Sequence, residues 1–195
     1  TEVNVLMMLL ERYLRQEVEE LHYNDVQLKT IGKTNSLPKR VFNLLQESIA
    51  KMSENNGLTL TLALSYSSRW DISRAVQMIA LDVRRGKLSP EDVNEQKISS
   101  FLQTHYMPDP DLVVRTSGEM RLSNFLMWES AYSEIFVTPC LWPDFNREQY
   151  YLALKDFQKR QRRFGMTGEQ IQSMQNTSTS FTQKVIDAFS KRRHG

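Results

Sequence analysis

Apolar residues in the first part of the chain recur at spacings of three and four positions. This spacing is typical of an amphipathic helix, and Met7 and Met8 widen its apolar surface beyond one stripe. We therefore expect a helix with apolar neighbours on two sides, and Thr1 is a candidate for its N-cap. The residues that define the pattern are Val3, Leu6, Leu9, Leu10, Tyr13, Leu14, Val18 and Leu21.

Along the rest of the chain, short runs typical of strands, either apolar or alternating apolar and polar, alternate with patterns typical of helices. Gly32 ends the first such run, and Asn55-Asn56-Gly57 forms the turn before the next one. The predicted strands are 26–31, 58–66, 112–114 and 133–137, and the predicted helices are 38–52, 72–83, 125–131 and 147–163, with a small helical excursion between 89 and 102. This order predicts an α/β fold with a mostly parallel central sheet flanked by helices.

Composition narrows the class of protein without naming a function. The chain has 195 residues, of which 40% are hydrophobic and 25% are charged, and this balance is ordinary for a globular domain. A formal net charge of +2 gives no general case for nucleic-acid binding. We therefore expect a protein that binds no nucleic acid. The lone cysteine, Cys140, leaves no internal disulfide and fits a reducing compartment. No apolar run reaches membrane-spanning length, and we expect a cytoplasmic protein.

The stretch 109–125 carries the strongest candidate chemistry. An apolar strand ends at Arg115, a turn of small residues follows, and Arg121 precedes the polar pair Ser123 and Asn124, either of which would cap the helix predicted next. Ligands of open α/β sheets collect at the carboxyl ends of the strands. Two guanidiniums, several hydroxyls, free amide N–H groups and a helix N-terminus therefore predict a site for a dianionic group such as a pyrophosphate.

A second candidate for anion binding follows the predicted strand 58–66. Several hydroxyl residues lead there into Arg69, which stands where the strand meets the next helix. The plain alternative is a capped helix with Arg69 in solvent. The same kind of alternative applies to the first candidate, whose two arginines could pair with Asp111 and Glu119 on the surface.

Glu134 is a candidate metal ligand because it interrupts the otherwise apolar strand 133–137. One interpretation places it on the solvent face of that strand. The other makes it a hard oxygen ligand for magnesium beside a pyrophosphate. His105 has no partner at a metal-ligand spacing and is most simply a loop residue.

Beginning at Asp109, the chain reads D-P-D-L-V-V-R-T-S-G-E-M-R-L-S-N-F-L-M-W, followed by A-Y-S-E-I-F and L-W-P-D-F. This string resembles the signature of the cis-prenyltransferases, specifically the bacterial undecaprenyl diphosphate synthases. The resemblance runs without a gap to Phe145, and in weaker form from about Glu2 to Gly165. A string this long with fixed arginines is far more specific than a short glycine pattern. It implies that family's α/β fold, with a hydrophobic tunnel bordered by the first predicted helix.

The resemblance also implies site residues. The isopentenyl diphosphate site would consist of Arg115, Arg121, Ser123, Arg69, Ser117, Gly118 and Asn124, of which the first three hold the pyrophosphate. Glu134 would help to hold Mg²⁺, and Met120 stands where some relatives have a histidine. Arg163 and Gly165 match an Arg-x-Gly that reaches the active site of the neighbouring subunit, which implies a homodimer.

The implied activity is that of a prenyltransferase. It condenses isopentenyl diphosphate in cis onto farnesyl diphosphate and yields a long polyprenyl diphosphate, expected to be undecaprenyl diphosphate for the cell-wall lipid carrier. Contact with a membrane is expected through the lipid product. One alternative is a non-catalytic partner subunit of a heteromeric enzyme, against which the intact R-T-S-G-E-M-R-L-S-N string argues. A nucleotide-binding module is less favoured because no glycine-rich loop is present.

One block of the family pattern, Asp-Gly-Asn-Gly-Arg-Trp, does not occur in the 195 residues. We expect it in an N-terminal part of the natural protein that precedes this sequence, together with the catalytic aspartate. The 195 residues would then be inactive by themselves. Residues 1–165 would form the catalytic domain without its phosphate-loop part, and the polar residues 166–195 would form a mobile C-terminal tail.

Overall fold

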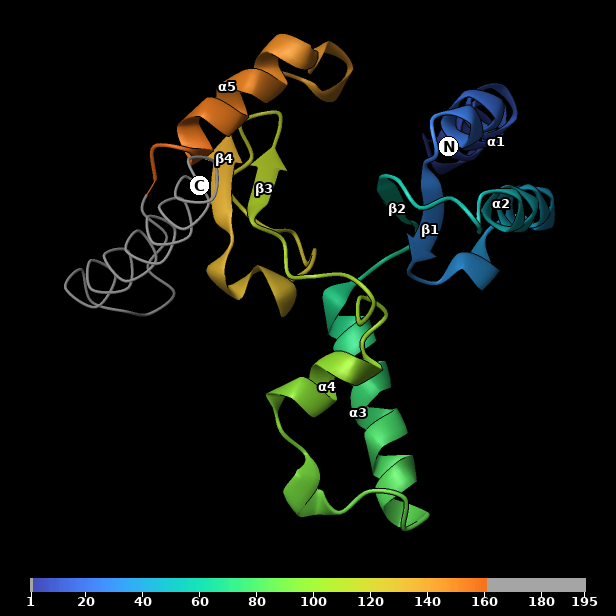
Figure 1. Ribbon diagram of the computed structural model, residues 1–195, viewed down its shortest axis with the longest axis vertical. Coiled ribbons are helices and arrows are strands. Elements are labelled where there is room, and N and C mark those ends of the chain that lie inside the picture. Colours follow the sequence, from blue (N-terminus) through green and yellow to red (C-terminus); the bar gives the residue numbers. More distant parts are fainter. Residues whose placement is uncertain (1, 161–195) are drawn as a thin grey trace, which may run out of the picture. The chain divides into compact units, whose positions relative to one another are not determined.

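The computed structural model describes residues 2–160, and these residues form two compact units (Figure 1). The N-terminal unit comprises the residues up to Asp109 together with Arg121–Ala131. The C-terminal unit comprises Pro110–Met120 and the described residues from Tyr132 on. Thr1 and the predicted tail 166–195, like Arg163 and Gly165, lie outside the described residues.

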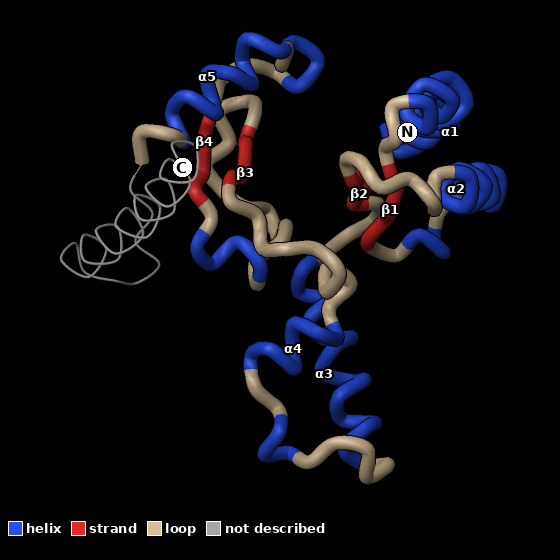
Figure 2. The backbone as a smooth tube through the Cα atoms, in the orientation of Figure 1, coloured by secondary structure: helices blue, strands red, loops and turns tan. Residues whose placement is uncertain are grey.

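The N-terminal unit begins with two helix–strand pairs. Its elements are α1 (Glu2–Tyr23), β1 (Gln27–Ile31), α2 (Lys39–Lys51) and β2 (Thr59–Ala63). The two strands pair in parallel, with Ile31 opposite Ala63, and both helices pack against them (Figure 2). The core between them is a cluster of buried residues, Leu14, Val18, Leu28, Leu37, Leu45 and Met52. This packing confirms the predicted stripe of the first helix from Leu10 to Leu21, whereas Val3, Leu6, Leu9 and Tyr13 of that stripe are exposed.

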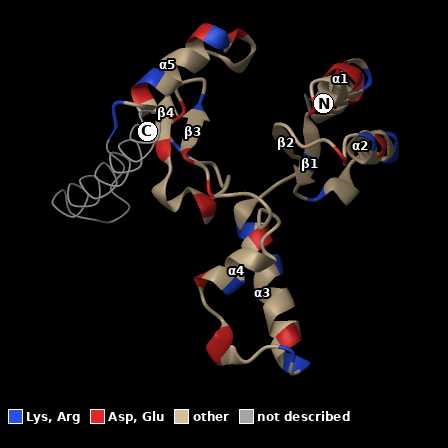
Figure 3. Ribbon diagram, viewed as in Figure 1, with Lys and Arg blue, Asp and Glu red and all other residues tan. Residues whose placement is uncertain are grey.

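Both α1 and α2 carry acidic and basic residues (Figure 3), and two ion pairs join the helices. Arg40 Nε lies 2.7 Å from Glu11 Oε1, and Lys51 Nζ donates a hydrogen bond to Glu19. The cation of each pair is exposed, and pairs in contact with solvent contribute little to stability. The apolar cluster therefore does most to hold the two helices on the strands.

The connection after β1 requires glycine at position 32. Gly32 has φ +107°, and a Cβ added there would lie 2.1 Å from the carbonyl oxygen of Leu64. The Gly32 N–H donates to Gln103 Oε1 at 2.6 Å, so the turn is also held by a residue far along the chain. Only glycine combines this conformation with this close approach.

A helical pair, α3 (Ser68–Arg84) and α4 (Glu95–Phe101), completes the N-terminal unit. Asp71 is fully buried and joins the two helices. Its Oδ1 accepts hydrogen bonds from Arg74 Nε (3.0 Å) and Nη2 (2.9 Å), and its Oδ2 accepts one from the Gln103 N–H (2.9 Å). Arg74 Nη2 also donates to the Phe101 carbonyl at 2.7 Å. A buried carboxylate with this many donors is compensated. Helix α3 begins at Ser68, so Asp71 lies in its first turn.

The C-terminal unit contains the second parallel strand pair, β3 (Leu112–Arg115) and β4 (Glu134–Val137), in which Arg115 stands opposite Val137. It continues into α5 (Arg147–Phe157), whose first N–H groups, those of Glu148 and Gln149, donate to the side chain of Asn146. The described strands thus form two two-stranded parallel sheets. Parallel strands with helices confirm the predicted α/β class.

The helix predicted for 125–131 is wrong. This stretch consists of turns followed by a short 3₁₀ helix at Glu129–Tyr132. Leu126 has φ +44°, which an α-helix cannot contain, and the N–H of Met127 donates to the side chain of Ser68. The polar pair before it therefore caps no helix of its own. The predicted excursion 89–102 is helical only at Pro90–Asp92 and in α4.

Candidate functional site

The carboxyl ends of β1 and β2 lie side by side, because the strands are parallel and in register. Leu64 N donates to the Ile31 carbonyl (2.9 Å) and Lys33 N donates to the Ser65 carbonyl (3.3 Å), which extends the pairing past both strand ends. The chain then enters α3 through the cap residue Ser67, and the exposed side chain of Arg69 stands at the start of this helix. The predicted position of Arg69 at a strand–helix junction is thus confirmed.

The backbone N–H groups that open α3 already have partners. Ser68 N donates to the Asn124 carbonyl and Arg69 N donates to Asn124 Oδ1, both at 2.9 Å. Trp70 N donates to Ser67 Oγ at 3.4 Å, and Asp71 N donates to the Ser67 carbonyl at 3.0 Å. An anion at this end of the unit must therefore be bound by side chains rather than by an open helix N-terminus.

Arg121 and Ser123 belong to the same unit as Arg69 and have exposed side chains. Ser123 and Asn124 both adopt left-handed backbone conformations, with φ +51° and +61°. Asn124 is half-buried, and its side chain bonds to the start of α3. Three of the seven sequence-predicted substrate residues thus present polar groups to solvent from the N-terminal unit, and Asn124 connects the segments that carry them.

In the C-terminal unit, Arg115 is the last residue of β3 and is half-buried. Its carbonyl accepts the Thr138 N–H at 2.9 Å, which fixes the backbone at the strand end. Its side-chain Nε is buried and, among the described residues, has no hydrogen-bond acceptor. A buried guanidinium N–H without an acceptor is costly, and an anion at the strand end would satisfy it.

The turn after Arg115 differs from the prediction in one respect. Ser117 and Gly118 have φ +62° and +69°, which is the signature of a tight two-residue turn. Their N–H groups were expected to be free for a ligand, but Ser117 N donates to the Cys140 carbonyl (2.8 Å) and Gly118 N donates to the Thr138 carbonyl (2.9 Å). The turn is thus tied to the segment after β4. What it offers a ligand is the exposed hydroxyl of Ser117.

Glu134 opens β4, is half-buried, and is engaged by a cation. Its Oε2 accepts a hydrogen bond from Arg160 Nη1 at 2.8 Å, and Arg160 also bonds to Asp156. These two carboxylates raise the pKa of the Arg160 guanidinium, the Glu134 hydrogen bond most. Across residues 2–160, no three His, Cys, Asp or Glu side chains are grouped so that they could hold a metal ion. One paired carboxylate does not provide the oxygen shell of Mg²⁺, so these residues do not by themselves fit the predicted metal.

Two aromatic contacts at the start of α3 were not predicted. Lys33 Nζ lies 4.9 Å from the centre of the Trp70 ring, which brings a cation to the start of α3. Tyr66 packs edge-on against Phe125, with ring centres 5.9 Å apart. The pKa of the Tyr66 phenol is raised, mainly by burial and to a smaller extent by the negative charge of Glu129. The sequence could have suggested Lys33, because it directly follows the glycine that ends the first strand.

Along α1, apolar side chains extend beyond the core. Val3, Leu6 and Met8 are 63%, 58% and 71% exposed. A groove of about 260 Å³ between α1 and α2 continues this surface and is lined by Asn4, Met7, Met8, Glu11, Pro38, Arg40 and Val41. Such an apolar face would suit one wall of the expected tunnel. These residues form a groove and not an enclosed tunnel. No helix within residues 2–160 is long and apolar enough to cross a membrane.

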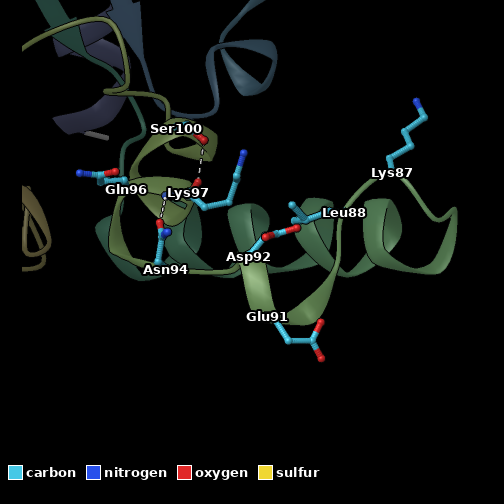
Figure 4. Close-up of a pocket in the computed structure, with 8 residues that line it drawn as sticks. All are labelled: Lys87, Leu88, Glu91, Asp92, Asn94, Gln96, Lys97 and Ser100. Atoms are coloured by element: carbon cyan, nitrogen blue, oxygen red, sulfur yellow. Dashed lines mark hydrogen bonds between the residues drawn. The ribbon is translucent and has the colours of Figure 1, made fainter.

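A larger pocket, of about 630 Å³, lies at the α3–α4 connection (Figure 4). It is lined by Lys87, Leu88, Glu91, Asp92, Asn94, Gln96, Lys97 and Ser100. Asn94 Oδ1 caps α4 by accepting the Lys97 N–H at 2.9 Å, and Ser100 Oγ donates to the Lys97 carbonyl at 2.7 Å. These groups serve the local turns, and none of the candidate site residues lines this pocket.

Each unit thus has the features of an α/β protein in which arginine and hydroxyl side chains suited to a phosphate-bearing ligand stand at a strand end or in the segment that follows it. The family model described as putative undecaprenyl diphosphate synthase matches residues 1–165. The chain therefore belongs to this family, and the resemblance stated for its central string is confirmed.

Individual relatives agree with the family. The chain is 48% identical over 172 residues to an isoprenyl transferase of Chlorobaculum tepidum, in an alignment that covers 88% of this chain and 65% of the relative. It is 45% identical over 172 residues to a (2E,6E)-farnesyl-diphosphate-specific ditrans,polycis-undecaprenyl-diphosphate synthase of Coxiella burnetii, covering 88% of this chain and 73% of the relative. The chain thus spans about two thirds of the length of these relatives.

Solved structures support the fold. Lavandulyl diphosphate synthase from Lavandula x intermedia, in complex with dimethylallyl diphosphate, matches with a TM-score of 0.82 at 36% identity, covering 84% of this chain and 71% of that one. A probable undecaprenyl diphosphate synthase from Campylobacter jejuni matches with a TM-score of 0.74 at 31% identity, covering 84% and 74%. Both similarities confirm the α/β class predicted from the sequence.

Proposed function

We propose that the protein containing this chain is a cis-prenyltransferase that condenses isopentenyl diphosphate onto farnesyl diphosphate. Family membership and the names of the relatives support this activity. The undecaprenyl product and its use as a cell-wall lipid carrier belong to the same proposal. The observation that carries it is Arg115 at the carboxyl end of β3, whose buried Nε has no acceptor within residues 2–160.

The reaction joins C4 of isopentenyl diphosphate to C1 of the allylic diphosphate. The bond from C1 to the pyrophosphate oxygen breaks, pyrophosphate leaves with the electron pair, and a proton leaves C2 of the isopentenyl unit. In this scheme Arg115, Arg121 and Ser123 bind a pyrophosphate through charge-assisted hydrogen bonds, and Arg69 adds positive charge near it. Binding through these side chains orients the isopentenyl carbon for attack.

The hydrocarbon product needs an apolar surface, and α1 supplies one. Its exposed Val3, Leu6 and Met8 and the groove beside α2 are suited to a flexible polyprenyl chain. We assign this face to product binding and expect membrane contact, from a cytoplasmic location, through the product. We further propose Mg²⁺ as cofactor, to which Glu134 would contribute one oxygen ligand and the other ligands would come from groups outside the described residues. The homodimer, with Arg163 and Gly165 reaching the neighbouring active site, is also part of the proposal.

A non-catalytic partner subunit is the second candidate. Such a subunit would need the dimer face but not the substrate string. The buried Arg115 Nε, which has no acceptor among the described residues, favours the catalytic candidate, because a bound pyrophosphate would satisfy it.

The test is steady-state kinetics on the full natural protein with farnesyl diphosphate, isopentenyl diphosphate and Mg²⁺. Arg115→Lys keeps the charge but loses the planar pair of donors, and we expect the KM for isopentenyl diphosphate to rise about tenfold or more. Arg12→Lys, on the exposed side of α1, is the matched control and should leave this KM unchanged. If the wild-type protein consumes no isopentenyl diphosphate, the result would support the second candidate, a non-catalytic partner subunit.

A further inference from the structure

The side chain of Asn124 bridges two segments that carry candidate pyrophosphate ligands, and this arrangement was not expected from the sequence. Its Oδ1 accepts the Arg69 N–H at 2.9 Å, and its Nδ2 donates to Ser67 Oγ at 2.7 Å. Its carbonyl accepts the Ser68 N–H at 2.9 Å. Three consecutive residues at the start of α3 are therefore bonded to one asparagine.

A reciprocal bond closes the bridge. Ser68 is 1% exposed, and its Oγ accepts the Met127 N–H at 3.1 Å. The loop after Arg121 is thus held to α3 at both Asn124 and Met127. This double attachment prevents the loop from pivoting about a single contact.

The backbone of this loop needs such support. Ser123, Asn124 and Leu126 have φ values of +51°, +61° and +44°, and none of them is glycine. Left-handed conformations are unfavourable for serine and above all for leucine, whereas asparagine tolerates them well. Conformations of this kind persist where surrounding contacts impose them. The bonds to α3 are the contacts that impose them here.

We propose that Asn124 is a positioning residue and not a pyrophosphate ligand. Resting on the proposed function, the inference is that its amide fixes Ser123 and Arg121 relative to Arg69, so that the exposed side chains of these three residues face one pyrophosphate together. Asparagine suits this role because one side chain offers both an acceptor for Arg69 N–H and a donor for Ser67 Oγ.

The kinetic test is a double-mutant cycle in the full natural protein with Asn124→Ala, Ser67→Ala and the double variant. If Asn124 acts through the bridge, Asn124→Ala raises the KM for isopentenyl diphosphate about tenfold, and adding Ser67→Ala changes it by no more than about twofold. Fully additive losses would mean that the amide contacts the substrate directly, and they would overturn the proposal.

Asn146→Ala is the matched control for lost helix capping. Asn146 caps α5 through the Glu148 and Gln149 N–H groups, and it lies in the other unit. We expect it to lower the melting temperature without changing the KM for isopentenyl diphosphate. A rise in KM as large as that of Asn124→Ala would show that general destabilisation explains both, and it would also overturn the proposal.

Hydrogen exchange separates this inference from the proposed function. Measured without substrate, the Ser68 and Arg69 amides should exchange about tenfold faster in Asn124→Ala than in the wild-type protein. Unchanged exchange would refute the bridge whether or not the enzyme turns over. Faster exchange in a protein that consumes no isopentenyl diphosphate would leave the bridge standing and refute the proposed function alone.

Discussion

Asp71→Asn should destabilise the N-terminal unit more than any other single-atom change on α3. Asp71 is 0% exposed and accepts three hydrogen bonds, two from Arg74 and one from the Gln103 N–H. An amide in its place must turn its NH₂ group toward either the guanidinium or the backbone N–H, so at least one donor meets another donor. It also leaves the charge of Arg74, whose side chain is only 26% exposed, without its partner.

Breaking a buried ion pair from one side costs about 3–5 kcal/mol. Part of the Arg74 charge is solvated and its bond to the Phe101 carbonyl remains, so we expect the lower end, about 3 kcal/mol. For a chain of this size, that loss lowers the melting temperature by about 10 °C. Urea denaturation of the full natural protein, followed by tryptophan fluorescence, measures the free energy of unfolding directly.

Two controls test the reasoning. Asp71→Asn with Arg74→Met removes both charges and should lose less stability than Asp71→Asn alone. Glu19→Gln removes the charge from the pair with Lys51, whose side chains are 78% and 38% exposed, and its effect on stability should be far smaller. A loss below about 1 kcal/mol for Asp71→Asn would refute the claim that the buried pair joins α3 to α4.

Three further outcomes follow from the described residues. Gly32→Ala places a Cβ 2.1 Å from the Leu64 carbonyl oxygen at φ +107°, so circular dichroism melting should reveal a loss of about 3 kcal/mol or more. Burial raises the pKa of Tyr66; stability should fall as the pH rises past 10, where the unfolded phenol loses its proton first, and Tyr66→Phe should remove this fall in alkaline urea titrations. The hydrogen bond from Lys51, with its charge, lowers the pKa of Glu19 from 4.5; the pair therefore stabilises the fold above that pH and loses its effect as the pH falls through the lowered value, and Lys51→Met should return the Glu19 pKa, followed by NMR, toward 4.5.

Sequence reasoning identified the strands and most helices because their burial is repetitive. Leu14 and Val18 on α1 and Leu45 on α2 follow the helical spacing and all enter the same core cluster. The strand that ends at Arg115 was recognisable from a short apolar run stopped by a charge. Family membership was also recognisable from the string that begins at Asp109.

The segment after Arg121 shows where such reasoning fails. Phe125, Leu126 and Trp128 look like the apolar side of a helix, yet the backbone turns at Leu126 with φ +44°. Its hydrogen-bond partners, such as Ser68, come from a segment almost sixty positions earlier in the chain. Local periodicity carries no information about a partner at that distance.

What the sequence by itself determined is which residues can carry charge and which can be buried: the arginines and hydroxyls at the strand ends, the apolar faces of the helices, and the family that has this combination. Tertiary structure decided which polar groups remain available. The N–H groups of Ser117, Gly118 and Arg69 donate hydrogen bonds to carbonyl or amide oxygens of residues distant in the sequence, and Glu134 is paired with Arg160. The physical reason is that a hydrogen bond depends on where the chain brings two groups together, whereas hydrophobicity and charge belong to each residue alone.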